Sequence, residues 1–84
     1  MVDPRFPSMK ARQLRRVIDR LGYEQQRKGS GGSHQRLRAE GRPTITWAFH
    51  DGVTIPPGIV HAVLCKQIGL DIDEALALLS KRNR

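Results

Sequence analysis

The chain has 84 residues, of which 38% are hydrophobic and 27% are charged, and its formal net charge at pH 7 is +7. This length fits one small domain, in which folding buries roughly 60–65% of the unfolded chain's surface, and the composition excludes an intrinsically disordered chain. The longest apolar stretch, around residues 59–64, is too short to span a membrane, and no secretion signal follows Met1, so we expect a cytoplasmic protein with no membrane association.

The first predicted element is an amphipathic helix that follows a short leader. Residues 1–8 contain two prolines and are predicted to be a flexible leader, and Ser8 suits the N-cap position of the helix. Apolar side chains then recur three and four residues apart as far as Gly22, where the helix is predicted to end. These apolar residues are Leu14, Val17, Ile18 and Leu21.

The opposite face of this helix is basic. Asp19 can pair with Arg15 or Arg16 one turn away, so we expect most of the basic face to be a solvated helix surface. Lys10 and Arg12, near the start of the helix, are the better candidates for contacting a ligand.

Three short strands are predicted next, at residues 23–28, 33–39 and 44–49. The segments between them are Gly-Ser-Gly-Gly at 29–32 and Glu-Gly-Arg-Pro at 40–43, and both are short enough for antiparallel hairpins. The pattern therefore predicts a three-stranded antiparallel meander.

The third of these strands carries an aromatic face. Ile45, Trp47 and Phe49 alternate with polar or small residues, and this alternation favours packing of the three side chains in the core. Stacking of Trp47 on a nucleic-acid base is the alternative interpretation. The sequence His50-Asp51-Gly52 is then expected to turn the chain away from the sheet.

A second helix is predicted after two consecutive prolines. Pro57 or Gly58 opens it, and it continues to Gly69. Its predicted buried stripe consists of Val60, Val63, Leu64 and Ile68.

A third, short helix is predicted from a capping box. Asp71 suits the N-cap position and Glu74 lies three residues later, ahead of apolar side chains at Ile72, Leu76 and Leu79. The order helix, three-stranded antiparallel sheet, helix, with a short extra C-terminal helix, indicates the α+β class with the helices on one face of the sheet. We expect one domain over residues 9–80, with a C-terminal extension at 71–80 and a basic tail at 81–84.

The cysteine and histidine pattern argues against a cofactor site. Cys65 is the single cysteine, and its apolar neighbours favour a small buried residue over a reactive thiol. Three histidines without a second cysteine do not give metal-binding spacing, so we expect no metal and no small-molecule cofactor.

His34 is the most informative titratable residue. In an extended segment, His34, Arg36 and Arg38 point to one side of the strand and Leu37 points to the other. Guanidinium groups bind phosphate oxygens, and an imidazole exchanges protons near neutral pH, so this group suits a phosphodiester. Residues 1–40 hold ten Lys or Arg and four acidic residues, whereas residues 41–80 hold two and four, so the first half is the expected footprint for nucleic acid.

Four segments of the chain resemble the HicA toxins of bacterial toxin–antitoxin systems. They are MKARQL at residues 9–14, the triplet Gly32-Ser33-His34, IPPG at 55–58 and KQIGL at 66–70. The resemblance covers residues 9–70 and leaves residues 1–8 and the acidic helix after Leu70 outside it. It implies a fold like that of double-stranded-RNA-binding domains, messenger-RNA cleavage, and inhibition by a HicB-like antitoxin. It also implies that His34 is the catalytic histidine, with Gly32 and Ser33 completing the triplet.

The leading hypothesis is metal-independent cleavage of messenger RNA. His34 acts as general base on a ribose 2′-hydroxyl, and Arg36 and Arg38 stabilise the charge that develops on the phosphate. Lys28, beside the glycine-rich loop, is a further candidate for RNA contact and one of four candidates to protonate the leaving oxygen. The other three are Tyr23, His50 and His61, and none of the four is assigned. We expect His50 to be a turn residue and His61 to lie on a helix surface.

Two other functions fit the same residues. A non-catalytic RNA-binding module of this fold needs only the basic surface, and it predicts salt-sensitive binding without cleavage. A protein whose main task is to engage a partner chain, through its sheet or last helix, is the third interpretation. A histidine on the surface after a glycine-rich loop, with no chemical role, is the ordinary alternative for His34.

Overall fold

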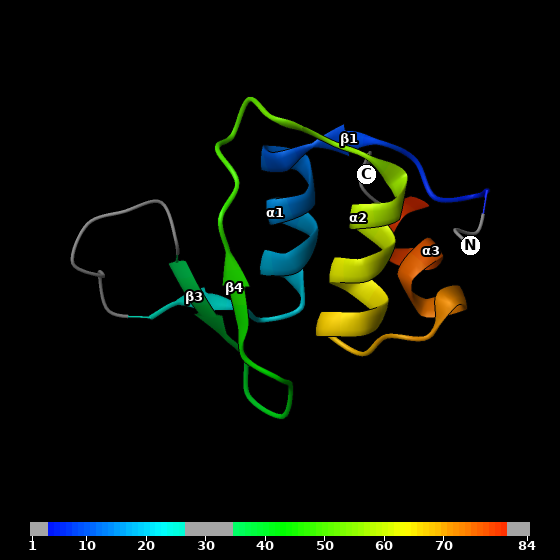
Figure 1. Ribbon diagram of the computed structural model, residues 1–84. Coiled ribbons are helices and arrows are strands. Elements are labelled where there is room, and N and C mark those ends of the chain that lie inside the picture. Colours follow the sequence, from blue (N-terminus) through cyan, green and yellow to red (C-terminus); the bar gives the residue numbers. More distant parts are fainter. Residues whose placement is uncertain (1–3, 27–34, 81–84) are drawn as a thin grey trace.

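The computed structural model describes residues 4–26 and 35–80 (Figure 1). The chain folds into the elements β1 (Met9–Lys10), α1 (Ala11–Arg20), β2 (Glu24–Gln25), β3 (Gln35–Arg38), β4 (Ile45–Trp47), β5 (Thr54–Ile55), α2 (Pro57–His61), η1 (Ala62–Gln67, a π-helix) and α3 (Ile72–Ser80). Within the described part of the chain, no helix is long and apolar enough to cross a membrane.

The three predicted strands form an antiparallel sheet in the order β2-β3-β4. Glu24 pairs with Arg38 across β2 and β3, and Leu37 pairs with Ile45 across β3 and β4. Within the described residues, the strands cover less of the chain than predicted, but the meander and the α+β class are confirmed. This architecture is compatible with the fold of double-stranded-RNA-binding domains.

A second, two-stranded sheet was not predicted. Met9 of β1 pairs with Ile55 of β5, and Lys10 pairs with Thr54, in an antiparallel arrangement. This pairing joins the start of the first helix to the segment just before the second, as Figure 1 shows. Two-residue strands carry no periodicity that a sequence pattern can reveal.

Helix α1 begins later than predicted, so the assignment of Ser8 as its N-cap is wrong. Lys10 occupies that position, with an extended backbone at φ −70° and ψ 148°, because Met9 and Lys10 are held in β1. The side chain of Gln13 accepts a hydrogen bond from the Lys10 main-chain N–H at 3.0 Å. Gly22 follows the helix at φ +96°, a conformation that favours glycine.

One apolar core joins the three-stranded sheet to all the helices. Leu14, Val17 and Ile18 of α1 and Leu37 of β3 are fully buried, and Ile45 and Trp47 of β4 are nearly so. The assignment of Trp47 to the core is therefore confirmed, and its ring packs edge-on against Phe49 with centroids 5.1 Å apart. In Figure 1, the sheet and α3 lie on opposite sides of the α1–α2 pair.

The second predicted helix is α2 followed without a break by η1. All four residues of the predicted stripe are buried, and Pro57 is the first helical residue. The change to a π-helix was not predicted. The Ile68 N–H donates to the carbonyl of Val63, five residues earlier, at 3.1 Å, which is the hydrogen-bond spacing of a π-helix.

The third helix has the predicted capping box. The Glu74 N–H donates to Asp71 Oδ1 at 2.8 Å, and the Asp71 N–H donates to Glu74 Oε1 at 3.1 Å. Of the predicted apolar face, Leu79 is buried and Leu76 is partly buried. The prediction is wrong at Ile72, which is 38% exposed, because α3 turns Ala75 toward the core in its place.

Phe6, in the segment expected to be a leader, is buried. It is 3% exposed, and its ring meets the His61 ring edge-on with centroids 5.0 Å apart. Arg5 and Pro7 also share a surface pocket with Leu76 and Leu79 of α3. The described residues before β1 therefore pack beside the C-terminal helix.

Candidate functional site

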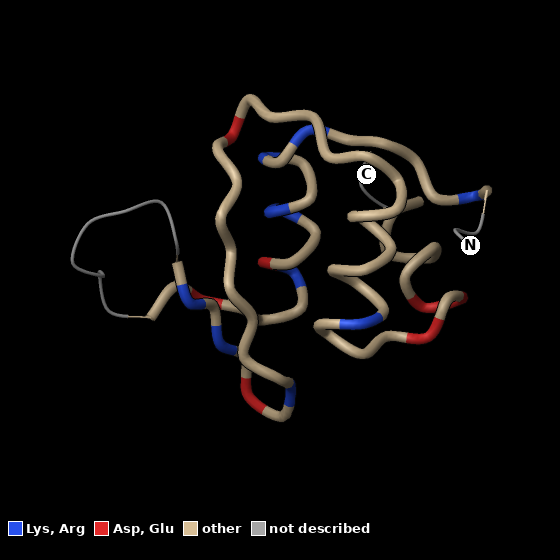
Figure 2. The backbone as a smooth tube through the Cα atoms, in the orientation of Figure 1, with Lys and Arg blue, Asp and Glu red and all other residues tan. Residues whose placement is uncertain are grey.

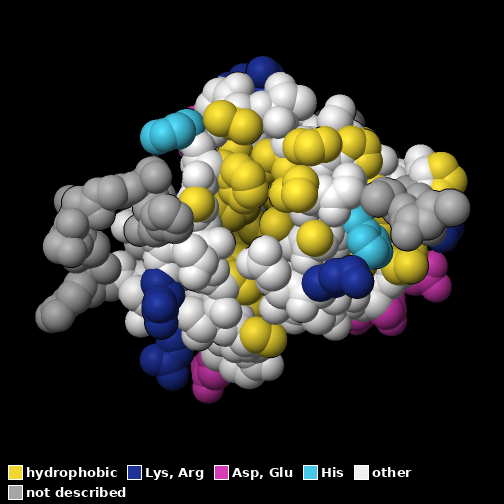
Figure 3. All heavy atoms as spheres, viewed as in Figure 1, with side chains coloured by type: hydrophobic (Ala, Val, Ile, Leu, Met, Phe, Trp, Pro, Cys, Tyr) yellow, Lys and Arg dark blue, Asp and Glu magenta, His cyan; other side chains and the backbone are white. Residues whose placement is uncertain are grey.

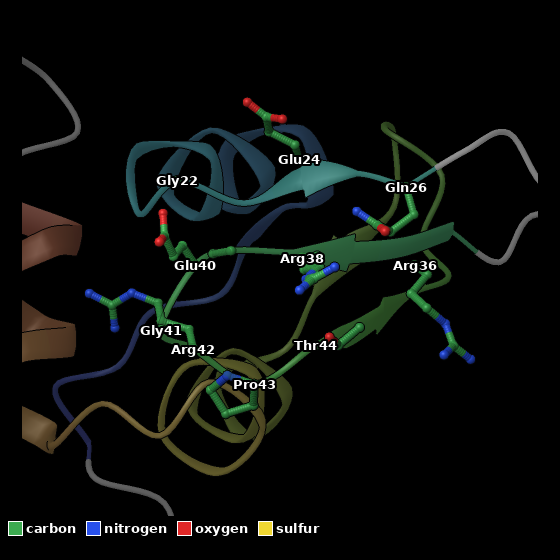
Figure 4. Close-up of a pocket in the computed structure, with 11 residues that line it drawn as sticks. Gly22, Glu24, Gln26, Arg36, Arg38, Glu40, Gly41, Arg42, Pro43 and Thr44 are labelled. Carbon is green, nitrogen blue, oxygen red and sulfur yellow. The ribbon is translucent and has the colours of Figure 1, made fainter.

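The outer face of the three-stranded sheet carries Arg36 and Arg38. Both side chains are exposed, and Leu37 between them is fully buried, as the period-two alternation predicts. Arg36 lies opposite Thr46 of β4, and Arg38 lies opposite Glu24 of β2. Figure 4 shows both guanidinium groups on the open face of the sheet, clear of the helices.

A shallow groove runs along this face and is polar in character. Its lining combines three arginines, two glutamates and the turn between β3 and β4: Gly22, Glu24, Gln26, Arg36, Arg38, Ala39, Glu40, Gly41, Arg42, Pro43 and Thr44. Figure 2 shows basic residues along β3 and α1, whereas acidic residues gather at the start of α3. The groove therefore lies in the basic part of the fold, where an anionic chain is attracted.

Hydrophobic surface lies elsewhere. In Figure 3, hydrophobic side chains gather over the region between β4 and α2. Val53 and Ile59 are each 41% exposed. The arginine face of the sheet is thus separate from the apolar surface and is suited to a charged ligand rather than to an apolar one.

Tyr23 supports the turn that bounds the groove. Its hydroxyl donates to the carbonyl of Pro43 at 2.5 Å, and Gly41 in the same turn has φ +77°. Burial raises the pKa of the Tyr23 phenol, and Arg42 opposes this only in part. The phenol therefore stays protonated and keeps its donor role over the physiological pH range.

Lys10 and Arg12 do not line this groove. The Lys10 ammonium donates to the Gly52 carbonyl at 3.2 Å, and the Arg12 main-chain N–H donates to the Asp51 carbonyl at 3.3 Å. Both residues lie at the start of α1, beside the β1–β5 sheet, and both side chains are exposed. The structure brings Arg36 and Arg38 together in the groove, whereas Lys10 and Arg12 lie outside it.

A cluster around Arg15 joins α1 to the start of β3. Its Nη1 donates to Gln35 Oε1 at 3.0 Å, and its Nε donates to Asp19 Oδ1 at 3.3 Å. The guanidinium carbon also lies 5.9 Å from the centre of the Trp47 ring. The pairing with Asp19 is as predicted, but helix periodicity gave no signal for the contacts with the sheet.

The remaining predicted site residues fall outside the described part of the chain. These are Lys28, Gly32, Ser33 and His34. Of the other candidates for proton donation, His50 is an exposed turn residue, as expected. The Val53 N–H donates to the His50 carbonyl and closes this turn. His61 lies on α2 and is partly buried, because its ring packs against Phe6.

Cys65 lies away from the groove and is not activated. Its side chain is partly buried beside His61 and Lys66, in a pocket between η1 and the start of α3. Burial raises the pKa of its thiol, Asp71 adds to this rise, and Lys66 opposes it. The thiol is therefore protonated at neutral pH, consistent with an unreactive cysteine.

Comparison with known proteins points to a family. A family model described as the HicA toxin of bacterial toxin-antitoxin matches residues 11–70. Neither the curated proteins nor the solved structures give a significant match. The matched segment runs from the first residue of α1 to Leu70, so it contains the whole three-stranded sheet and α2 with η1, and it ends before α3.

Proposed function

We propose that this chain, which belongs to the HicA family of bacterial toxin–antitoxin toxins, is an endoribonuclease that inhibits translation by cleaving messenger RNA. The family match over residues 11–70 carries the proposal. The exposed arginines of β3 support it, because they belong to the same short segment as the Gly32-Ser33-His34 triplet.

The proposed chemistry needs His34, the two arginines of β3, a second proton donor and the RNA itself. His34 accepts the proton of a ribose 2′-hydroxyl, the 2′-oxygen attacks the adjacent phosphorus, and the 5′-oxygen leaves with a proton from a second donor. Arg36 and Arg38 stabilise the charge that builds up on the phosphate oxygens. The product is a 2′,3′-cyclic phosphate.

The proposed partner is a HicB-like antitoxin. An antitoxin inhibits such an enzyme most simply by covering His34 and the outer face of β3. A partner bound there prevents RNA from reaching Arg36 and Arg38, whose side chains are exposed in the chain on its own.

The experiment that tests the cleavage proposal uses purified protein and end-labelled RNA in excess chelator. We expect cleavage to persist, the fragments to end in a cyclic phosphate, and a single deoxyribose at the scissile position to block cutting there. Efficient cutting of the deoxy substrate would instead indicate hydrolysis by an activated water, and loss of cleavage in chelator would indicate a metal-dependent enzyme. Binding without any cleavage would favour an RNA-binding module.

The contribution of the β3 arginines is testable by salt dependence. Replacing Arg36 and Arg38 together with glutamine should weaken RNA binding for every sequence and reduce the slope of log K against log salt by about 0.7 for each phosphate that the protein no longer neutralises. Arg16→Gln with Arg20→Gln removes the same charge from the exposed side of α1 and is the matched control. Equal reductions of affinity in the two double variants, measured by fluorescence anisotropy, would assign the binding to net charge alone.

A further inference from the structure

Arg15 contacts three other residues, unlike an arginine on a solvated helix surface. Its guanidinium donates to Gln35 at 3.0 Å and to Asp19 at 3.3 Å, and its carbon lies 5.9 Å from the centre of the Trp47 ring. The side chain is 24% exposed, against 54% for Asp19. The guanidinium is therefore enclosed between α1 and the inner side of the sheet.

Gln35 occupies a particular place in the fold. It is the first residue of β3, it pairs with Trp47 across the sheet, and its side chain is half-buried on the same side as Leu37. Arg36 follows it on the outer side of the strand. In the sequence, Gln35 stands between His34 and Arg36, the two residues to which the proposed reaction assigns the proton transfer and a phosphate contact.

The arrangement around Arg15 suits a clamp rather than a phosphate-binding group. Asp19 and Gln35 each accept a hydrogen bond from the guanidinium, and the Trp47 ring lies within cation–π distance of it. A planar guanidinium serves all three neighbours at once because its donors are fixed in a fork, whereas a lysine ammonium lacks that geometry. These contacts hold the side chain on the inner side of the sheet, opposite the groove.

We propose that Arg15 is a positioning residue for RNA cleavage, which holds the start of β3 through Gln35 and thereby sets the placement of Arg36. This inference rests on the proposed ribonuclease function. Small errors in the placement of reacting groups lower the rate of the chemical step much more than they lower substrate binding. Loss of the clamp should therefore reduce kcat by a larger factor than it raises KM.

The test compares Arg15→Met, Gln35→Met and the double variant with the wild type in steady-state RNA cleavage. Each single substitution removes one partner of the hydrogen bond and keeps an unbranched apolar stem. We expect each to lower kcat about 10- to 100-fold, and the double variant to be no slower than the slower single variant, because all three lack the same interaction. Arg16→Met, on the exposed side of α1, is the matched control and should retain wild-type kcat.

Circular dichroism and thermal melts establish that the variants are folded at the assay temperature. If Arg15→Met is unfolded, Gln35→Met carries the test, because it leaves the contact of Arg15 with Asp19 in place. A folded variant of either kind with wild-type kcat, or additive effects in the double variant, would overturn the inference. An increase in KM with unchanged kcat would also overturn it and would make Arg15 a substrate-binding residue.

The same assays separate this inference from the function on which it rests. If the wild type does not cleave RNA, or if His34→Ala cleaves as fast as the wild type, the proposed function fails and the role of Arg15 fails with it. If His34→Ala is inactive while the two methionine variants match the wild type, the proposed function stands and only the role of Arg15 is rejected.

Discussion

Replacement of His34 with alanine should lower the rate of RNA cleavage about 10²- to 10⁴-fold, the usual contribution of general acid–base catalysis, while RNA binding persists. Binding persists because the proposed phosphate contacts are made by Arg36 and Arg38, which the substitution does not alter. Single-turnover cleavage of labelled RNA gives the rate, and anisotropy at the same salt concentration gives the affinity. The variant should also lose the ability to arrest growth when it is expressed without an antitoxin.

His50→Ala is the matched control for this experiment. His50 is exposed in the turn that follows β4, so its replacement makes the same chemical change at a position away from the groove. We expect the control to retain cleavage within a few-fold. Unchanged cleavage by His34→Ala would reject the general-base role, and a severe loss in His50→Ala would instead make His50 the second proton donor, one of the four candidates for that role.

The three-stranded sheet was predictable because its residues alternate with a period of two. Leu37 lies between two arginines and is fully buried, while both arginines are exposed. Ile45 and Trp47 flank an exposed threonine in the same way. The outer face of the candidate site follows directly from this alternation, since an inward leucine forces its neighbours outward.

Features that depend on contacts between distant segments were not predictable. The pairing of β1 with β5 joins residues more than forty positions apart through two-residue strands. The contact of Arg15 with Gln35 likewise depends on how α1 crosses the sheet. The spacing of Arg15 and Asp19 along the helix is the same whether or not Arg15 also contacts Gln35. The sequence pattern therefore favoured a solvated arginine paired with Asp19.

The π-helix η1 shows a different limit of sequence analysis. Its buried positions agree with a helical stripe, because Val63 and Leu64 face the core in either kind of helix. The wider turn is revealed only by the hydrogen bond between Ile68 and Val63. Apolar spacing identified the element and the side that it buries but not the type of its hydrogen bonds.

The two ends of the described chain add structure beyond the family match. Phe6 packs on His61 before the matched segment begins, and α3 follows it with its own capping box. A single phenylalanine in a short segment with two prolines gives no periodic signal, so this packing was not visible in the sequence.

Replacement of Ile55 with alanine should lower the free energy of unfolding by about 2–5 kcal/mol, because it leaves a cavity in a closely packed core. Ile55 is fully buried in β5, where it pairs with Met9 of β1. Domains of this size are stabilised by about 5–15 kcal/mol in total, so the decrease is a large fraction of the stability. A decrease of Tm by at least about 8 °C is expected in a thermal melt followed by circular dichroism.

Ile59→Ala is the control, because it makes the identical chemical change at a side chain that is 41% exposed on α2. Alanine is also the better helix former, so this variant should differ from the wild type by no more than about 0.5 kcal/mol. Equal destabilisation of the two variants would mean that the β1–β5 sheet is not part of the core. At a temperature where both variants remain folded, both should cleave RNA at the wild-type rate, since the β1–β5 sheet holds the start of α1 and not the arginine face of β3.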